Sequence, residues 1–178
     1  MELLDLYTDE RERTGRTIVR GEPVPKGTYL LVVHICIFSP DGKMLIQQRQ
    51  PFKKGWPGRW DVSVGGCAVA GDTSRSAAER EVREELGLTV DLSETRPTLT
   101  VHFERGFDEY YVLTMQLDPA SLTLQPEEVR AVRWADKEEI LRLIDGDLFV
   151  PYEKSMIELL FYRRDHRSSH TKPDPSKS

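Results

Sequence analysis

Three glutamates, Glu81, Glu84 and Glu85, fall within little more than one turn of a predicted helix. Residues three or four positions apart share a helix face, so their carboxylates crowd together near the C-terminal end of that helix. Like charges repel there, and the negative end of the helix dipole disfavours acids. A divalent cation would relieve both effects, and carboxylate oxygens suit Mg²⁺ or Mn²⁺. The spacing therefore indicates a hard-metal site for phosphate chemistry.

The helix that carries these glutamates has defined ends and one apolar face. Thr73 is a suitable N-cap, and Gly87 stands where a C-cap glycine belongs. Ala78, Val82 and Leu86 recur at four-residue spacing, which predicts a stripe that packs against the rest of the protein. The alternative is a glutamate-rich helix end that only faces solvent. The caps and the apolar stripe favour a packed, functional helix.

The stretch around this helix resembles the Nudix box, written G-x5-E-x7-R-E-U-x-E-E-x-G-U with U a bulky aliphatic residue. Gly66 opens the pattern and residues 80–88, REVREELGL, complete it. Gly65 and Gly66 lie where a backbone turns tightly or closely approaches a ligand. Asp72 stands where the family usually has Glu, which keeps the carboxylate but shortens it by one methylene. In the family that position braces the loop more than it performs chemistry.

Within this superfamily the chain is most similar to isopentenyl-diphosphate isomerases and the Nudix proteins grouped with them. The resemblance lies in the N-terminal preamble, the sequence IQQR, the loop at residues 53–58 and Trp60. Gly65 stands at the position of the isomerase catalytic cysteine, while Cys67 and Leu30 stand where metal-binding histidines are expected. The hydrolytic REUxEE pattern, often broken in isomerases, is intact. The resemblance therefore implies a hydrolase acting on a nucleoside diphosphate–X type substrate, with an isomerase or a non-catalytic nucleotide-binding module as alternatives.

The resemblance also implies a role for each residue of the box. The Mg²⁺ or Mn²⁺ ligands would be one carbonyl and three carboxylates, those of Gly66, Glu81, Glu84 and Glu85. One of these glutamates, or an acid outside the box, would accept the proton of the attacking water. Glu109 is our first choice for the outside acid because it resembles a metal ligand of the isomerase branch, and Glu127 and Glu128 are the alternates. Arg80 would orient a neighbouring glutamate.

Residues 50–60 form a predicted loop rich in basic and aromatic side chains. Arg49 and Lys53 could contact phosphate, and the face of Trp56 could stack on a base or cover an apolar tail. The alternative is a solvated basic loop whose tryptophans fill gaps in the core. For Trp60 we favour that packing role.

The elements that must position these residues begin with a buried strand. Residues 29–38, YLLVVHICIF, are almost continuously apolar, which predicts a central strand covered on both faces. Residues 39–42, SPDG, predict a turn, and residues 43–49 its partner strand. His34 is expected to be a hydrogen-bonded packing residue, and Cys36 a buried, inert thiol.

The rest of the chain alternates irregularly between strands and helices. Further strands are expected at residues 61–64, 89–92, 98–103, 109–117 and 129–134. Asp136 should cap a helix that runs to about residue 144, and Pro151 should occupy the first turn of a last helix that ends near residue 162. This order predicts an α/β (α+β) fold. The resemblance implies an α/β/α sandwich around a mixed β-sheet.

Three segments are expected along the chain. Residues 1–27 read as a preamble, with strands at 2–7 and 16–20 around a turn at 9–15; it could cover the site or form a homodimer contact, but an ordinary edge hairpin is slightly favoured. Residues 28–163 would form the Nudix domain. Residues 164–178 are polar and rich in proline and serine, which predicts disorder.

Composition limits the remaining function classes. A chain of 178 residues suffices for one domain with a substantial core. The net charge of −5 argues against non-specific binding to nucleic acid or a membrane as the main activity. The resemblance implies a small-molecule diphosphate as the partner. Two cysteines imply no disulfide framework, and with no signal peptide or apolar run of about 20 residues they indicate a reduced, cytoplasmic setting.

Overall fold

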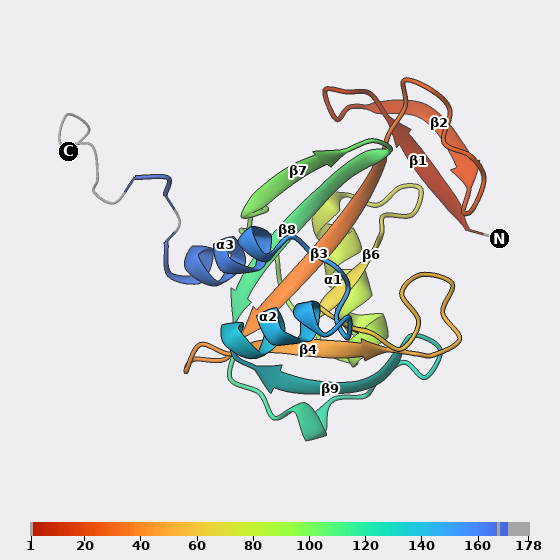
Figure 1. Cartoon of the computed structure of the whole chain (residues 1–178). Coiled ribbons are helices and arrows are strands. Elements are labelled where there is room, and N and C mark those ends of the chain that lie inside the picture. The colour runs from red at the N-terminus through yellow and green to blue at the C-terminus, as the bar shows by residue number, and fades with distance from the viewer. Residues whose placement is uncertain (1, 167, 171–178) are drawn as a thin grey trace.

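The computed structural model of the chain describes residues 2–166 and 168–170. A seven-stranded mixed sheet lies between helix α1 on one face and helices α2 and α3 on the other, and a separate two-stranded hairpin stands at one end (Figure 1). This arrangement confirms the predicted α/β/α sandwich. None of the helices in the described ranges is long and apolar enough to cross a membrane.

The central strand, β3 (Leu30–Phe38), is the most buried element of the sheet. It runs parallel to β8 (Gly106–Thr114) along its whole length and antiparallel to β6 (Val64–Cys67). Its side chains alternate between two cores. Val33, Ile35 and Ile37 join the cluster under α1, whereas Cys36 and Phe38 join the cluster under α2 and α3. Cys36 is fully buried, which confirms the expected buried thiol, and that burial raises its pKa.

The sheet divides into two halves that diverge from one point. β3 and β4 (Met44–Arg49) share the pair Phe38–Met44 and then separate (Figure 1). From there β3 pairs with β6 and β8, whereas β4 pairs with β5 (Trp60–Asp61) and β9 (Val129–Ala135). β7 (Leu99–Phe103) pairs with β8 at the edge. This divergence leaves the box residues between the two half-sheets.

Helix α1 (Ser74–Leu86) carries the glutamates and has the predicted caps. The Thr73 hydroxyl accepts the Ser76 backbone N–H at 3.1 Å, and Gly87 adopts φ +64°, a left-handed conformation that suits glycine. Val82 and Leu86 are fully buried in the core between α1 and the sheet. The helix is therefore fixed at both ends and along one face.

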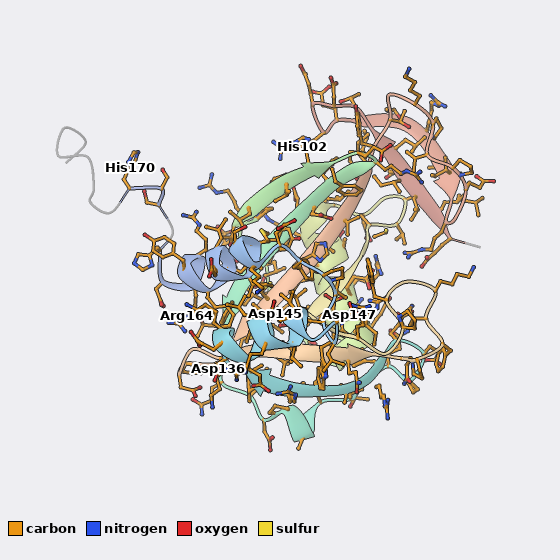
Figure 2. The ribbon with its side chains drawn as sticks, viewed as in Figure 1. His102, Asp136, Asp145, Asp147, Arg164 and His170 are labelled. Atoms are coloured by element: carbon orange, nitrogen blue, oxygen red, sulfur yellow. The ribbon has the colours of Figure 1, made fainter. Side chains whose placement is uncertain are left out.

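Helices α2 and α3 cover the opposite face. α2 (Lys137–Asp145) begins at the predicted cap, where the Asp136 carboxylate accepts the backbone N–H of Glu139 at 2.7 Å. α3 (Lys154–Asp165) begins after Glu153 rather than at Pro151 and continues beyond residue 162, so both predicted ends were wrong. Its last turn is held by packing, because Arg164 lies over the ring of Phe38 at 6.0 Å (Figure 2). Residues 167 and 171–178 of the tail, which was predicted to be disordered, lie outside the described residues.

Several predicted strands differ from the structure. Residues 89–92 form no strand, because Leu92 packs into the core and its N–H donates to the Glu79 carboxylate at 2.7 Å instead of to a neighbouring strand. β8 begins three residues earlier than predicted, because Phe103 pairs with Gly106 in a tight hairpin. The predicted strand 61–64 is split into β5 and β6.

The N-terminal segment forms the predicted hairpin with a shorter turn. β1 (Leu3–Tyr7) pairs with β2 (Arg13–Val19), so the last three residues of the turn predicted at 9–15 belong to a strand. The hairpin joins the sheet through reciprocal backbone hydrogen bonds of 2.9 and 3.0 Å between Tyr7 and Tyr29. In Figure 2, His102 on β7 lies on the side of the sheet nearest this hairpin.

Candidate active site

The close approach of Gly66 to Glu81 defines the centre of the candidate site. Gly66 lies in β6, and a Cβ atom at this position would overlap the Glu81 carboxyl group. Only glycine leaves room for that carboxylate. β6, the second of the two strands that replace the predicted strand 61–64, therefore places backbone rather than a side chain against the box helix.

Two of the three box glutamates are buried. Glu81 is 7% exposed and Glu85 is 5% exposed. Burial raises the pKa of Glu81, partly offset by the charge of Arg80. Burial and the charge of Glu81 raise the pKa of Glu85 to about 8, although Gln47 donates a hydrogen bond of 2.9 Å to its Oε2. Ionisation of both groups is therefore unfavourable unless a cation lies beside them.

Arg80 connects the box glutamates to the preceding loop. It donates to Asp72 Oδ2 at 2.9 and 3.1 Å, to Glu81 at 2.9 Å and to Glu84 at 3.1 Å. It also donates to the carbonyl of Cys67 at 3.3 Å. Burial lowers the pKa of Arg80, but the charges of Glu81 and Asp72 outweigh that effect and raise it. Arg80 therefore pairs with neighbouring glutamates as the sequence indicated.

The oxygen atoms of these residues are suitable ligands for a divalent metal ion, although their side chains do not point to a common centre. Across residues 2–166 and 168–170, no three acidic, histidine or cysteine side chains converge on one point. Glu81 and Glu84 turn to Arg80, whereas Glu85 turns to Gln47. The available ligand atoms are nevertheless hard oxygens. Glu81 and Glu85 are buried, and the Glu81 carboxylate occupies the space that a Cβ at Gly66 would take. That set fits Mg²⁺ or Mn²⁺.

A second group of charged residues lies beside Glu85. The Gln125 backbone N–H donates to the Glu85 carbonyl at 3.0 Å, and the Glu128 N–H donates to the Gln125 carbonyl at 3.1 Å, so the turn that carries Glu128 is bonded to the end of α1. The charges of Glu128 and Asp61 also contribute to the raised pKa of Glu85. Lys53 forms an ion pair with Glu128, and Arg49 Nη1 lies 3.4 Å from Asp61. The structure thus brings Arg49, Lys53 and the alternate acid Glu128 to the box.

Asp61 and its partner Tyr152 were missed by sequence reasoning. The Tyr152 hydroxyl donates to Asp61 Oδ1 at 3.0 Å. Burial raises the pKa of Asp61, while His34 and Arg49 lower it. The one feature of the sequence that could have indicated Asp61 is its position shortly before the adjacent glycines Gly65 and Gly66. Tyr152 is 91 residues away in sequence and carries no local signal.

The aromatic residues of the loop before β5 have different surroundings. Trp56 is 48% exposed and adopts φ +48°, which is rare for a bulky residue. The guanidinium of Arg59 lies 5.4 Å from its ring centroid. Trp60 packs against the core under α2 and α3, with Arg133 4.6 Å from its ring centroid, as a packing role predicts.

Glu109, our first choice for the outside acid, lies apart from this group. It lines a cavity of about 400 Å³ between the hairpin and the first residues of α1, 3.5 Å from Arg11. Glu85 lies about three turns further along the same helix from Ser74, which lines that cavity. Strand register places Glu109 and Gly66 opposite the same residue, Val33, on either side of β3. Within residues 2–166 and 168–170, no hydrogen bond or ion pair joins Glu109 to the buried glutamates. No interaction places Glu127 among the box residues.

Alternation along β8 places Asp108 on the opposite face of the sheet from Glu109. Asp108 Oδ1 lies 3.1 Å from Nε2 of His34, whose ring stacks on Tyr110 with centroids 4.6 Å apart. His34 is therefore the expected hydrogen-bonded packing residue. A Cβ at Gly65 would lie 3.2 Å from His34 Nδ1, so Gly65 also faces away from Glu81.

Comparisons with known proteins agree with these observations. A profile described as the NUDIX domain matches residues 28–157. An uncharacterized Nudix hydrolase of Listeria innocua is 51% identical over 152 residues, 85% of this chain and 90% of that protein. An isopentenyl-diphosphate Delta-isomerase of Salmonella arizonae is 30% identical over 148 residues, 78% of this chain and 79% of that protein. A crystal structure from Deinococcus radiodurans superimposes with a TM-score of 0.73 at 27% identity, covering 93% of this chain and all of that one.

Proposed function

Because the chain belongs to the Nudix hydrolase family, we propose that it cleaves the diphosphate linkage of a nucleoside diphosphate–X type substrate with the help of a divalent metal ion. Hydrolases of this family act on small molecules. The observation that carries the proposal is the pair of buried glutamates, Glu81 and Glu85, beside the backbone of Gly66. A buried acidic pair of this kind is costly in a protein that binds no cation.

In this proposal the metal ligands are oxygens of the box, those of the Gly66 carbonyl, Glu81, Glu84 and Glu85. A bound Mg²⁺ or Mn²⁺ ion would neutralise the diphosphate charge and lower the pKa of a water molecule. Arg80 holds Glu81 and Glu84 until that ion binds, and Asp72 keeps Arg80 in place. Gln47 on β4 holds the Glu85 side chain through its hydrogen bond of 2.9 Å.

Glu128 is the outside acid that the geometry supports best. Its turn is hydrogen-bonded to the Glu85 carbonyl through Gln125, and its side chain forms an ion pair with Lys53, whereas Glu109 pairs with Arg11 beside the hairpin. We propose that Glu128 accepts the proton when water attacks phosphorus and the bridging oxygen leaves. Glu109 is therefore replaced by Glu128 in the proposed catalytic set.

The diphosphate itself would contact the basic side chains of Arg49 and Lys53. Arg49 and Lys53 now pair with Asp61 and Glu128, and a bound phosphate would take over part of these pairings. The exposed ring of Trp56 lies in the same loop and could stack on a base or an apolar group of the substrate. These contacts make the loop the proposed substrate-binding element.

A panel of nucleoside diphosphate–X compounds with Mg²⁺ or Mn²⁺ tests the proposed function. Products identified by phosphorus NMR should arise from cleavage between the two phosphates. Glu85→Gln should abolish this metal-dependent hydrolysis while circular dichroism shows an unchanged fold. Full activity in Glu85→Gln would contradict the site assignment, and no turnover of any compound by the wild-type protein would contradict the function.

One specific observation favours isomerisation as the second candidate function, the 30% identity to an isopentenyl-diphosphate Delta-isomerase. Against it, Gly65 offers no side chain for proton transfer, and the box glutamates are complete.

The cytoplasmic location, the homodimer contact and the segment division at residues 27 and 163 stay predictions. Because α3 continues to Asp165, we place the end of the Nudix domain there.

A further inference from the structure

The N-terminal hairpin lies outside the matched residues 28–157 but bonds directly to the loop that precedes α1. The Leu3 carbonyl accepts the backbone N–H of Ala70 at 2.8 Å, and the Asp5 carboxylate accepts that of Gly71 at 2.8 Å. Arg13 donates to the carbonyl of Asp72. Three consecutive residues of the box loop are therefore bound to the hairpin.

The two hairpin side chains involved also bind each other. Arg13 Nε lies 3.3 Å from Asp5 Oδ2, the carboxylate oxygen that receives the Gly71 N–H. The Asp5 side chain is only 14% exposed, so its charge is best satisfied by these two donors. Asp5 and Arg13 thus form one unit that binds a backbone donor and a backbone acceptor of the loop.

The loop continues this connection to the metal-binding carboxylates. The backbone of Asp72 is bound by Arg13, and its side chain receives both hydrogen bonds from Arg80. Arg80 in turn holds Glu81 and Glu84. A continuous set of hydrogen bonds therefore runs from the hairpin to two of the proposed metal ligands.

The loop also has hydrogen bonds of its own, because the Asp72 carboxylate accepts the Val69 N–H at 3.3 Å and the Ser76 hydroxyl at 3.1 Å, but its outer side is open at Gly71. Gly71 adopts φ +92°, and a Cβ at this position would meet no atom within 4 Å. Asp72 is one methylene shorter than the glutamate usual in the Nudix box, so its reach to Arg80 depends more closely on the position of the loop backbone. The hairpin restrains that backbone through Asp5 and Arg13.

The hairpin also borders the box directly. A cavity of about 390 Å³ is lined by Glu2 and Leu3 of the hairpin, by Val69 and Ala70 of the loop, and by Arg80 and Glu84. The hairpin is therefore one wall of a space that adjoins the proposed metal ligand Glu84 and the arginine that holds it, Arg80.

From these contacts we infer that the hairpin is a working part of the active site, in which Asp5 and Arg13 are positioning residues for Arg80 and the metal-binding glutamates. This inference rests on the proposed function, because it assumes that the box binds a divalent ion. It assigns to the hairpin a role in metal affinity rather than only in folding.

The test compares Arg13→Met with Arg16→Met in the full chain. Both arginines lie on β2 and are exposed, but within residues 2–166 and 168–170 no interaction involves the Arg16 side chain, which makes it the matched control. Removal of an outer partner of a metal ligand lowers metal affinity by about 10- to 100-fold. We expect roughly tenfold weaker Mn²⁺ binding, measured by electron paramagnetic resonance, in Arg13→Met and no change in Arg16→Met.

Two further measurements separate positioning from general stability. In the metal-free protein, the NMR signal of the Arg80 Nε–H that bonds to Asp72 should broaden or shift in Arg13→Met only. In an Arg80→Met background, Arg13→Met should cause no additional loss of Mn²⁺ affinity, because both changes break the same connection. Asp5→Asn provides a second variant if Arg13→Met does not fold.

Unchanged Mn²⁺ affinity and an unchanged Arg80 signal in a folded Arg13→Met protein would overturn the inference, even if its melting temperature falls. Additive losses in the double variant would overturn the route through Arg80. A wild-type protein that binds Mn²⁺ but hydrolyses no diphosphate would overturn the proposed function and leave this inference standing. A wild-type protein that binds no Mn²⁺ would overturn both.

Discussion

The carboxylate of Glu85 is 5% exposed and receives one hydrogen bond, from Gln47. Its raised pKa of about 8 means that the folded, metal-free protein holds a proton that the unfolded chain releases near its ordinary pKa of about 4.3. The folded state therefore binds more protons than the unfolded state between these two values. Stability is greatest below that window and falls as pH rises through it.

We predict that Glu85→Gln removes most of this pH dependence. In the presence of a chelator, the free energy of unfolding of the wild-type protein should fall between about pH 5 and pH 8, by on the order of 2 kcal/mol more than that of the variant. Urea unfolding at several pH values measures the difference. Glu158→Gln, on the exposed side of α3, is the control and should follow the wild type. Parallel curves for wild type and Glu85→Gln would contradict the raised pKa.

Gly65 and Cys67 decide the expected absence of isomerase activity. Moving a double bond requires an acid at one carbon and a base at another, each within hydrogen-bond reach. Gly65 supplies neither, and Cys67 lies two strand positions away, about 6–7 Å along the chain. Burial raises the pKa of Cys67, partly offset by Arg20, which disfavours the thiolate.

We therefore predict that the protein with Mg²⁺ does not convert isopentenyl diphosphate to its allylic isomer. Proton NMR follows the allylic product, and an authentic isomerase serves as the positive control. Cys67→Ala should retain diphosphate hydrolysis, because only the backbone carbonyl of Cys67 bonds to Arg80. Isomerisation that disappears in Cys67→Ala would make Cys67 the catalytic acid and overturn this reading.

At the scale of elements, the loop before β5 is fixed from two sides. Gln50 Nε2 donates to the carbonyl of Pro126 at 2.8 Å, next to the turn that carries Glu128. Arg59 forms an ion pair with Asp147 and donates to the carbonyl of Phe149 at 3.3 Å. These bonds hold Lys53 beside Glu128, whereas the neighbouring Lys54 is exposed.

This difference predicts distinct effects for two adjacent lysines. Lys53→Met should raise KM for the diphosphate substrate by about tenfold, because a charge-assisted hydrogen bond to phosphate contributes roughly 1.5–3 kcal/mol. Lys54→Met should change KM little. Steady-state kinetics on the best substrate of the panel distinguish them, and equal effects of both changes would show that Lys53 acts only through the net charge of the loop.

At the scale of the whole molecule, the candidate site is built where the two half-sheets diverge. β4 contributes Gln47, β6 contributes Gly66, α1 contributes Glu81 and Glu85, and the turn before β9 contributes Glu128. These segments are held together by the two cores on either side of β3. The site therefore depends on packing of the domain and not on the C-terminal tail.

Removal of residues 171–178 should leave hydrolysis and melting temperature unchanged. These residues are polar and rich in proline and serine, so they have little apolar area to bury. A shortened chain that ends at His170 retains all of α3 and can be compared with the full chain by calorimetry and turnover. A loss of activity or several degrees of melting temperature would contradict the prediction.

The sequence by itself determined the features that local signals encode. The caps at Thr73 and Gly87, the apolar stripe of α1 and the uninterrupted apolar run of β3 each depend on neighbours within a few residues. The box pattern likewise predicted the site glutamates, of which the structure buries Glu81 and Glu85. Such signals are readable because helix caps and periodicity act over one or two turns.

Only the tertiary structure decided which distant residues join that group. A shift of one residue in strand register moves a side chain to the other face of a sheet, and the sequence carries no local mark of register. Glu109 therefore falls beside Arg11 and Asp108 beside His34, whereas Glu128 reaches Glu85. The contacts of Asp5 with Gly71 and of Arg13 with Asp72 could not be predicted for a similar reason. They join residues that are 66 and 59 positions apart in sequence and that only the folded protein brings together.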